Sequence, residues 1–328
     1  MIHTIHPEFI KMIADAAKAP SGHNTQPWKF SIEANRIILE PDFSRRLAVV
    51  DADDHALFIS LGCALENLIL SAKAHGFSPA VSFNFQNGKD NISVDLIKSS
   101  GEKKDLLYDY INNRQSTRNE YSQQPIEQSK LDELKKAATD DSTEVLFFLS
   151  EAQIKQLAQF IIEGSNRQFS NKHFVNELVS WFRFSKQTAQ EKGDGIWTSS
   201  MGLPAMPGFM GNIVMKYFVS ASSEAKRWRK LIDKTAGFAL FIAQENTKTN
   251  WVTLGQSFQR FGLKATELNI MHAHVNMPCE EIEVRKKMIE QYQLGTRQPL
   301  LLIRFGYSGK MPCSFRRNTE SVIAQVFV

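Results

Sequence analysis

Cysteine is scarce in this sequence, and the common signatures of nucleotide and metal sites are missing. The 328 residues include 3 cysteines, and Cys63, Cys279 and Cys313 lie far apart with no CxxC pair. An odd number of widely spaced cysteines is typical of a reduced intracellular chain without a disulfide framework or a cysteine-based metal site. The sequence also lacks GxGxxG, a Walker-type glycine loop, GxSxG and HExxH, which are the usual signatures of nucleotide, serine-hydrolase and zinc-protease sites.

Long apolar runs and a strong excess of one charge are missing as well. No apolar run approaches the roughly 20 residues that cross a bilayer, and the first residues do not resemble an export signal. Lys and Arg number 39 against 35 Asp and Glu, an excess of 4 that is too small for a nucleic-acid-binding surface. With 42% hydrophobic and 23% charged residues, the composition is that of an ordinary globular protein. We therefore expect a cytoplasmic protein with no membrane or nucleic-acid partner.

Hydrophobic spacing predicts helices that alternate with short strands. Helical patterns cover about 7–17, 53–75, 103–113, 127–138, 151–163, 171–190, 251–270 and 280–292. Strands are expected at about 28–32, 36–40, 81–85, 92–97, 144–149, 237–243 and 300–305. The last two strands are unbroken apolar runs, which is typical of the centre of a sheet.

The stretch from Gly193 to Gly211 is rich in glycine and proline and is nevertheless apolar, with side chains such as Ile196, Trp197 and Met206. Irregular segments run over the surface of a protein, and one this apolar must cover something. We therefore expect residues 193–211 to form a lid.

Two helical segments share a residue pattern about 193 positions apart. The matching sets are Leu61-Gly62, Asn67-Leu68, Leu70 and Ala72, and Leu254-Gly255, Arg260-Phe261, Leu263 and Ala265. Each segment continues into an apolar, strand-like stretch. The repeat suggests two related halves.

The most distinctive string is APSGHNTQPW at 19–28, between a predicted helix and the first predicted strand. Ser21 and Gly22 leave backbone N–H groups accessible, and the side-chain amides of Asn24 and Gln26 offer paired donors and acceptors for a planar heterocycle. The alternative is a polar helix-to-strand connection followed by a buried tryptophan.

A second string, NRQSTRNEY at 113–121, combines the guanidinium groups of Arg114 and Arg118 with the hydroxyls of Ser116 and Thr117. These groups suit a phosphate monoester. In an extended segment Arg114, Ser116 and Arg118 would point to one side. The alternative is a solvated basic loop.

A third string, CSFRRNT at 313–319, follows the last apolar strand. Its Arg316 or Arg317 would close the same phosphate from another side. The alternative is a basic tail near a sheet edge.

Two other groups are interpreted as structural. His272 and His274 lie near Cys279 and Glu280, but His-x-His-x4-Cys matches no usual zinc spacing, so a polar loop is expected there. The aromatic residues of the following set are interpreted as packing residues: Phe169, Phe174, Trp181, Phe182 and Phe184.

Taken together, the three strings resemble those of the nitroreductase family of flavin enzymes. SGHNTQPW at 21–28 is similar to that family's SxxNxQPW, and RQSTR at 114–118 is similar to its phosphate-binding RxSxR. RFGY at 304–307, followed by Arg316-Arg317, is similar to its closing strand and arginine. Arg260 and the stretch 276–285 also fit the long-chain, Acg-like branch. The resemblance covers nearly the whole chain apart from residues 150–225.

The resemblance implies an α+β fold with a mainly antiparallel central sheet enclosed by helices, among which 57–72 and 254–268 are paired. Family members usually carry RxSxR before QPW, and two subunits share each flavin. The order is reversed here, which implies two halves, 1–112 and 113–328, fused as a pseudo-dimer in one compact unit. The second half would carry a lid-like insert at about 165–222.

The resemblance also implies FMN as the cofactor and assigns its binding residues. The phosphate is expected to meet Arg114, Ser116, Arg118 and either Arg316 or Arg317. The ring and ribityl chain are expected near Ser21, Gly22, His23, Asn24 and Gln26. No catalytic side chain and no metal are expected, because a flavin carries the chemistry itself.

The implied activity is NAD(P)H-dependent reduction of nitroaromatic or quinone-like acceptors through bound flavin, by a monomer or weak homodimer. Residues 193–211 would act as the gate. One alternative is a flavin-sequestering protein with little turnover, which a permanently closed lid would produce. Another is a degenerate relative that binds no cofactor.

Overall fold

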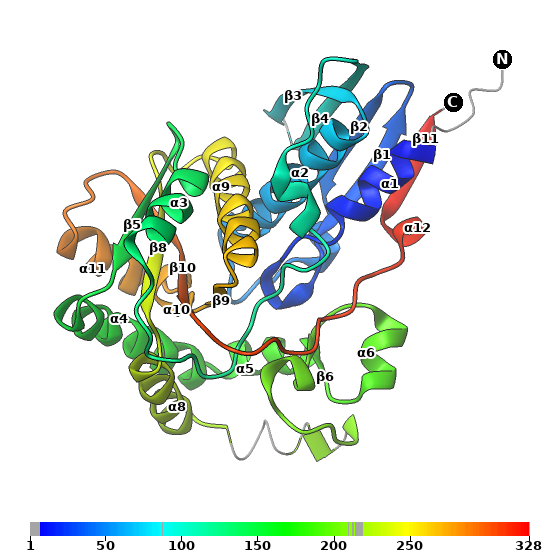
Figure 1. Ribbon diagram of the computed structural model, residues 1–328. Coiled ribbons are helices and arrows are strands. Elements are labelled where there is room, and N and C mark those ends of the chain that lie inside the picture. Colours follow the sequence, from blue (N-terminus) through cyan, green and yellow to red (C-terminus); the bar gives the residue numbers. More distant parts are fainter. Residues whose placement is uncertain (1–6, 87, 209, 212, 214–218, 328) are drawn as a thin grey trace.

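The computed structural model describes residues 7–86, 88–208, 210–211, 213 and 219–327, arranged in layers around a central pair of helices (Figure 1). The helices are α1 (Pro7–Ala16), α2 (His55–Ala74), α3 (Gln128–Ala138), α4 (Glu151–Ser170), α5 (Lys172–Trp181), α6 (Lys186–Lys192), α8 (Ala221–Asp233), α9 (Lys248–Glu267), α10 (Met277–Glu280), α11 (Ile282–Gln291) and α12 (Thr319–Val322). The strands are β1 (Trp28–Glu33), β2 (Arg36–Pro41), β3 (Phe77–Gln86), β4 (Lys89–Lys98), β5 (Thr143–Phe148), β6 (Phe182–Arg183), β7 (Ile196–Trp197), β8 (Gly237–Ala243), β9 (Met271–His274), β10 (Gln298–Gly306) and β11 (Ile323–Phe327). Short 3-10 turns are η1 (Gly22–Asn24), η2 (Phe43–Arg45), η3 (Leu106–Tyr110) and η4 (Thr198–Met201).

The predicted α+β class is confirmed, but the strands form two principal sheets instead of one central sheet. Their orders are β11-β1-β2-β4-β3 and β5-β8-β10-β9. Both are mainly antiparallel; β1 and β11 pair in parallel. Helices α2 and α9 lie between the sheets (Figure 1), and side chains such as Phe30 of β1 and Phe241 of β8 share one hydrophobic core with them. The helix pair fills the space that a continuous sheet would occupy.

The close crossing of α2 and α9 depends on two glycines. A Cβ atom on Gly62 would lie 1.9 Å from the backbone oxygen of Val252, and one on Gly255 would lie 2.1 Å from the backbone oxygen of Ile59. The two contacts are related by the same 193-residue offset that the sequence repeat shows, because Ile59 corresponds to Val252 and Gly62 to Gly255. The pairing of these two helices follows the sequence prediction.

Two polar pairs at this crossing obey the same relation. Nη1 of Arg260 donates to Oε1 of Glu66 at 2.9 Å, and Nε2 of Gln259 donates to Oδ1 of Asn67 at 2.6 Å. Residues 66 and 67 correspond to 259 and 260 under the offset, so each pair is the image of the other. The crossing therefore has an approximate twofold symmetry within one chain.

Helix α2 is a core helix, although its length and composition alone would allow it to cross a membrane. It is the one such helix in the described part of the chain, and 89% of its most apolar window is buried inside the fold. Packing against α1, α9 and the first sheet accounts for that apolar character.

The C-terminal segment links the two sheets. After β10 the chain runs back across the molecule (Figure 1), and β11 pairs with β1, with Ile323 opposite Phe30. On its way the segment passes the loop between α1 and β1, where the N–H of Arg317 donates to Oε1 of Gln26 at 2.9 Å. The last strand of the chain therefore completes the sheet that its first strand begins.

Several predicted elements are wrong: α4 runs to Ser170 and not to about 163, α8, β9 and β11 were not predicted, and two predicted helices do not form as expected. The stretch 103–113 forms the short turn η3, in which the Asp105 side chain accepts from the N–H of Leu107. The stretch 171–190 divides into α5, β6 and α6. The division occurs because Phe182 and Phe184 are buried in an apolar cluster, and Ser185 then caps the next helix.

Candidate functional site

A small cavity of about 120 Å³ lies where the three predicted strings meet. It is lined by Lys18, Pro20, Ser21, Asn24, Ile111, Asn112, Arg114, Gln115, Ser116, Arg118, His274, Pro312, Cys313, Ser314 and Arg316. Residues nearly 300 positions apart in the sequence thus share one cavity. We call it the arginine cavity.

Three arginines face the arginine cavity without a carboxylate partner. Nε and Nη1 of Arg114 and Nε of Arg316 are buried and lack hydrogen-bond partners, and no Asp or Glu is among the described residues that line the cavity. Burial is the main cause that lowers the pKa of Arg114 and of Arg118 to about 10 and that of Arg316 to about 9, and nearby arginines contribute to the lowering at Arg118 and Arg316. All three remain charged at neutral pH. Because a buried unpaired charge is costly, this arrangement suits an anion such as a phosphate group.

The residues of the second string are presented by an extended segment beside β9. The N–H of Thr117 donates to the backbone oxygen of His272 at 2.9 Å, and Thr117 is fully buried. Arg114, Ser116 and Arg118 line the arginine cavity together, but Gln115 lines it as well. Strict alternation along an extended segment therefore does not account for their placement.

Arg304 of β10 holds the end of this segment. Its Nη2 donates to the backbone oxygens of Arg118 and Asn119 at 2.9 and 2.8 Å, and its guanidinium carbon lies 4.0 Å from the ring centre of Tyr121. Arg304 is 1% exposed and does not line the arginine cavity. Its contribution is to position Arg118.

The loop after α1 is held in a strained conformation. His23, Asn24 and Gln26 have φ angles of 49°, 56° and 53°, which non-glycine residues adopt infrequently. Nδ2 of Asn24 donates to the backbone oxygens of Gly195 and Phe315, both at 3.1 Å, while its buried Oδ1 has no partner. Such strain is characteristic of functional loops.

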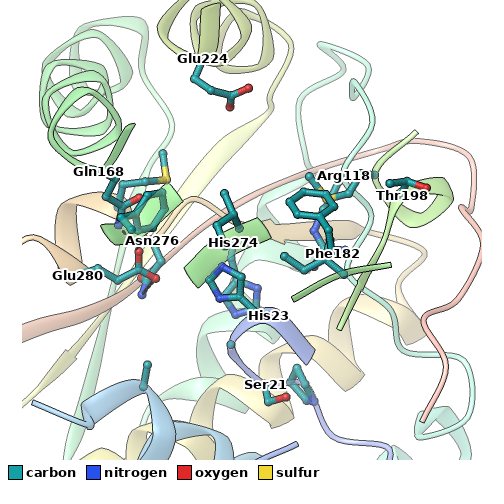
Figure 2. Close-up of a pocket in the computed structure, with 18 of the residues that line it drawn as sticks. Ser21, His23, Arg118, Gln168, Phe182, Thr198, Glu224, His274, Asn276 and Glu280 are labelled. Carbon is teal, nitrogen blue, oxygen red and sulfur yellow. Dashed lines mark hydrogen bonds between the residues drawn. The ribbon is translucent and has the colours of Figure 1, made fainter. Parts of the chain in front are cut away.

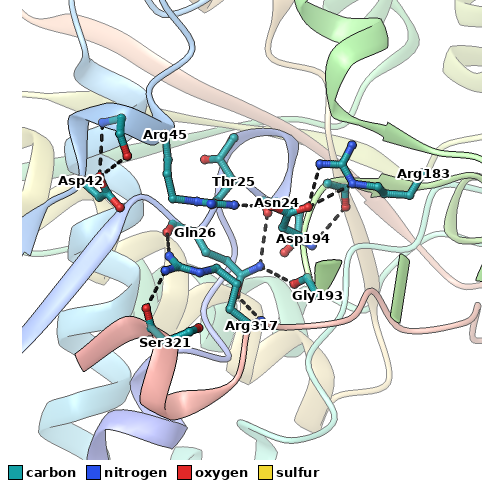
Figure 3. Close-up of polar contacts among 12 residues, drawn as sticks. Asn24, Thr25, Gln26, Asp42, Arg45, Arg183, Gly193, Asp194, Arg317 and Ser321 are labelled. Atoms are coloured by element: carbon teal, nitrogen blue, oxygen red, sulfur yellow. Dashed lines mark hydrogen bonds and ion pairs between the residues drawn. The ribbon is translucent and has the colours of Figure 1, made fainter. Parts of the chain in front are cut away.

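Gln26 and Arg317 were expected to face a ligand. They line neither the arginine cavity nor the larger cavity beside it, so this expectation is corrected. Nε2 of Gln26 donates to the backbone oxygen of Gly193 at 2.8 Å, and its Oε1 accepts from the N–H of Arg317 (Figure 3). The guanidinium of Arg317 donates to the backbone oxygens of Gln26 and Ser321. The two residues therefore join the loop to the lid segment and to the C-terminal segment.

A larger cavity of about 520 Å³ adjoins the arginine cavity, and we call it the aromatic cavity. Pro20, Ser21, Arg118 and His274 line both cavities. Gly22 and His23 of the first string line the aromatic cavity as well. Its walls are mainly apolar and include Phe169, Phe174, Leu178, Phe182, Phe184, Ile196, Met201, Leu203, Met206, Trp228 and Phe258.

The polar groups of the aromatic cavity lie on several sides of it (Figure 2). Burial lowers the pKa of His23 to about 4 and that of His274 to about 3, with Arg118 adding to both effects, so both imidazoles are neutral at pH 7. Glu224 accepts from Nη1 of Arg227 at 3.0 Å. The cavity is therefore a mostly apolar space with few formal charges.

The predicted lid segment covers part of the aromatic cavity. Ile196, Met201 and Met206, among others of 193–211, line it, whereas Phe209 lies outside the described residues. Asp194 contacts both Arg45 of η2 and Arg183 of β6 (Figure 3), the latter at 2.7 Å. The bonds from Asn24 and Gln26 join the start of the segment to the loop after α1, and the contacts of Asp194 join it to η2 and β6.

Sequence reasoning missed several residues of the aromatic cavity. One face of α2 contributes Ala56, Ile59, Ser60 and Cys63, and the α4–α10 region contributes Gln168, Asn276 and Glu280. His274, expected in a polar loop, lies in strand β9, where His272 is fully buried and His274 faces both cavities. The spacing His-x-His could have indicated a strand with two histidines on one face, because successive side chains of a strand point to opposite sides.

A cluster of possible metal ligands lies at the start of α2. Among the described residues it is the group of Asp51, Asp53 and His55. The oxygens of Asp51 accept from the N–H groups of residues 56 and 57, and Oδ2 of Asp53 accepts from Arg285 at 2.8 Å. These carboxylates therefore already cap a helix and form an ion pair.

No family model and no curated protein matches the sequence. Solved structures do resemble the fold. A nitroreductase with bound FMN from Bacteroides fragilis is 12% identical, covers 65% of this chain and 94% of its own, and gives a TM-score of 0.39. A nitroreductase-like family protein from Bacillus cereus is 13% identical, covers 66% of this chain and 94% of its own, and gives 0.40.

A third solved structure is an oxidised iodotyrosine deiodinase bound to FMN and 3-iodo-L-tyrosine. It is 11% identical, covers 65% of this chain and 95% of its own, and gives a TM-score of 0.42. Each of these three alignments spans about two thirds of this chain.

Proposed function

We propose that this protein is an FMN-binding oxidoreductase of the nitroreductase type, which uses NAD(P)H to reduce nitroaromatic or quinone-like acceptors. The observation that carries the proposal is a group of arginines without carboxylate partners, with Arg114 buried and Arg118 and Arg316 half-buried, at one end of a continuous, largely apolar site. A cation cluster for a phosphate and an apolar space for a planar ring are the two requirements of FMN.

The phosphate end would be formed by Arg114, Ser116, Arg118 and Arg316. The unpartnered Nε and Nη1 of Arg114 would donate to phosphate oxygens, and Arg316 would close the site from the C-terminal segment. Charge-assisted bonds of this kind are among the stronger hydrogen bonds in proteins. The strained loop would contribute Ser21 and Asn24, whose Oδ1 is buried without a partner.

The ring would occupy the aromatic cavity near Gly22, His23 and the α2 face. Its volume of about 520 Å³ lies within the usual range for ligand pockets. When bound, a flavin supplies hydride transfer from a reduced nicotinamide to an acceptor. The chain itself would orient the ring, keep His23 and His274 uncharged beside it, and exclude water with the lid segment.

One FMN per chain is expected, because the site draws one residue set from 1–112 and the other from 113–328. We propose that these ranges are two related halves fused as a pseudo-dimer with an insert at about 165–222, and the symmetric crossing of α2 and α9 supports this. A monomer or weak homodimer in the cytoplasm follows from the same proposal, with its cysteines reduced. Membership of the Acg-like branch stays a prediction.

A flavin-sequestering protein is the second candidate, and the fixed lid segment favours it. Asn24 and Gln26 tie that segment to the loop after α1, and Asp194 ties it to Arg45 of η2 and Arg183 of β6. If these bonds do not open, a nicotinamide cannot reach the ring.

The test is to load the purified protein with FMN, measure the flavin-to-chain ratio from absorbance, and mix it rapidly with NADPH or NADH. We expect a ratio of one and rapid bleaching of the flavin. A saturated ratio of two would refute the single-site architecture. No bleaching by either nicotinamide would favour the sequestering protein, and no flavin binding at all would indicate a degenerate relative.

A further inference from the structure

On the side of the aromatic cavity opposite Arg118, a carboxyl group lacks a counter-ion (Figure 2). Oε2 of Glu280 accepts from Nε2 of Gln168 at 2.7 Å, and its Oε1 accepts from Nδ2 of Asn276 at 3.3 Å. Neither oxygen contacts a cationic side chain of the described residues. Two neutral amides thus hold a carboxyl group at the surface of an apolar cavity.

The surrounding fold holds these amides in place. Oδ1 of Asn276 accepts from the N–H of Leu302 in β10 at 2.9 Å, so its NH₂ group is directed to Glu280. Helix α4 approaches α10 at Gly164, where a Cβ atom would lie 2.8 Å from the carbonyl carbon of Met277. Gln168 is one turn further along the same face of α4, and it is 3% exposed. The arrangement is therefore held by contacts within the fold itself.

We propose that Glu280, Asn276 and Gln168 form a subsite for an organic cation, whose ammonium group pairs with Glu280 while its apolar body lies against the aromatic walls. Charge-assisted bonds favour an ammonium group beside an unpaired carboxylate. Aromatic faces such as Phe169 and Trp228 add cation–π attraction. The second ligand of the cavity would therefore be an organic cation. This inference rests on the proposed function, which assigns the rest of the cavity to flavin.

Among the described residues that line the cavity, Arg118 is the cation without a carboxylate partner, and it lies on the side opposite Glu280 (Figure 2). His23 and His274 are neutral at pH 7. Arg227 is paired with Glu224, and Arg118 faces the arginine cavity as well. A cationic ligand would therefore meet its one unpaired carboxylate at Glu280.

The pairing has a definite pH dependence. Burial raises the pKa of Glu280 to about 7, against the two amide donors that favour its ionised form. At the start of α2, the charge of Asp51 raises the pKa of Glu280 and that of His55 lowers it. Glu281 and Arg285 lie on the α11 side, and Arg285 is bonded to Asp53. Ionisation of Glu280 is therefore expected mainly between pH 6 and 8, and the affinity for a cation rises with pH over this range.

The test uses two probes of equal size, 2-phenylethylamine and the neutral 2-phenylethanol. The amine stays protonated from pH 6 to 8, since aliphatic amines titrate near pH 10. Calorimetric titration of the FMN-loaded and the FMN-free chain is expected to show amine binding that tightens about tenfold from pH 6 to pH 8. Alcohol binding should not depend on pH.

Glu280→Gln keeps the shape and removes the charge, so the amine should bind about tenfold more weakly at pH 8 while the alcohol is unaffected. Glu281→Gln removes the same charge one residue away, outside the cavity lining, and should leave both affinities unchanged. Equal amine affinity in the wild type and Glu280→Gln, with the variant folded by circular dichroism, would overturn the subsite. So would amine binding that is the same at both pH values.

Flavin absorbance is recorded in the same samples. Amine discrimination without flavin binding would leave the subsite standing and reject the proposed function. Flavin binding without amine discrimination would do the reverse.

Discussion

Two arginines in this protein experience opposite surroundings. Arg260, at the crossing of α2 and α9, lies 2.9 Å from a carboxylate oxygen of Glu66 and 3.2 Å from one of Asp105; burial lowers its pKa, but these partners outweigh burial and raise it. Arg114, in the arginine cavity, has no carboxylate partner, and burial lowers its pKa to about 10. The crossing satisfies its charge from within the chain. The cavity leaves its charge for a ligand, and this difference separates a structural region from a binding region.

The largest expected effect breaks the structural region. In Gly62→Ala the new methyl group would lie 1.9 Å from the backbone oxygen of Val252, so α2 and α9 must move apart. We expect the free energy of unfolding to fall by about 3 kcal/mol, measured by urea denaturation. The control is Gly309→Ala, where no atom lies within 4 Å of the added carbon. Equal stability of the two variants would contradict the close crossing.

The binding region is tested by Arg114→Gln. Loss of a charged donor to phosphate should cost about 1.5–3 kcal/mol, so FMN affinity should fall about 10- to 100-fold, measured by quenching of flavin fluorescence. The control is Arg36→Gln, which removes an exposed ion pair with Asp95. If FMN affinity is unchanged in Arg114→Gln, Arg114 does not bind the phosphate, and the alternative of a basic loop holds.

In the flavin-free protein, removing the arginine from each of the two regions should change the free energy of unfolding in opposite directions. Arg260→Gln leaves Glu66 and Asp105 without their partner and should lower the free energy of unfolding by about 1 kcal/mol, a modest value because Arg260 is partly exposed. Arg114→Gln relieves an unpaired charge and should raise it by about 1 kcal/mol. Thermal unfolding without phosphate in the buffer checks both, and a shift of the same sign in both would remove the distinction.

A last effect concerns how stability changes with pH at Glu280. Because its pKa is raised to about 7 from the ordinary 4.5, the folded state binds more protons than the unfolded state between these values. Its contribution to stability is complete below pH 4.5 and is lost as pH rises through about 7. Glu280→Gln should therefore reduce the loss of stability between pH 5 and pH 8, by about 2.5 kcal/mol. An identical pH profile in wild type and variant would show that this carboxyl does not titrate as described.

Much of the architecture could be predicted from local patterns. Strong helical periodicity located the cores of α2 and α9, and the Leu-Gly repeat pointed to their relation. The extended spacing of Arg114, Ser116 and Arg118 predicted a common side, and they line one cavity. These features depend on residues close in sequence, which periodicity can detect.

Other features depend on contacts that no local pattern contains. The stretch 171–190 has a helical pattern, but burial of Phe182 and Phe184 with Leu47 and Val50 interrupts the helix. Gln26 has the amide expected of a ligand-binding residue, yet its donors and acceptor are used by Gly193 and Arg317. Tertiary partners decided both outcomes.

The sequence by itself determined the cores of the main helices and of most strands, where small residues permit two helices to cross closely, and which side chains are candidates for a phosphate site. The tertiary structure decided that Arg316, and not Arg317, faces the arginine cavity. It also decided that Glu280 and Arg118 lie on opposite sides of the aromatic cavity. The physical reason is that propensity and periodicity act over a few residues. Pairing of charges and exclusion of water are decided by whichever distant segments the fold packs around each group.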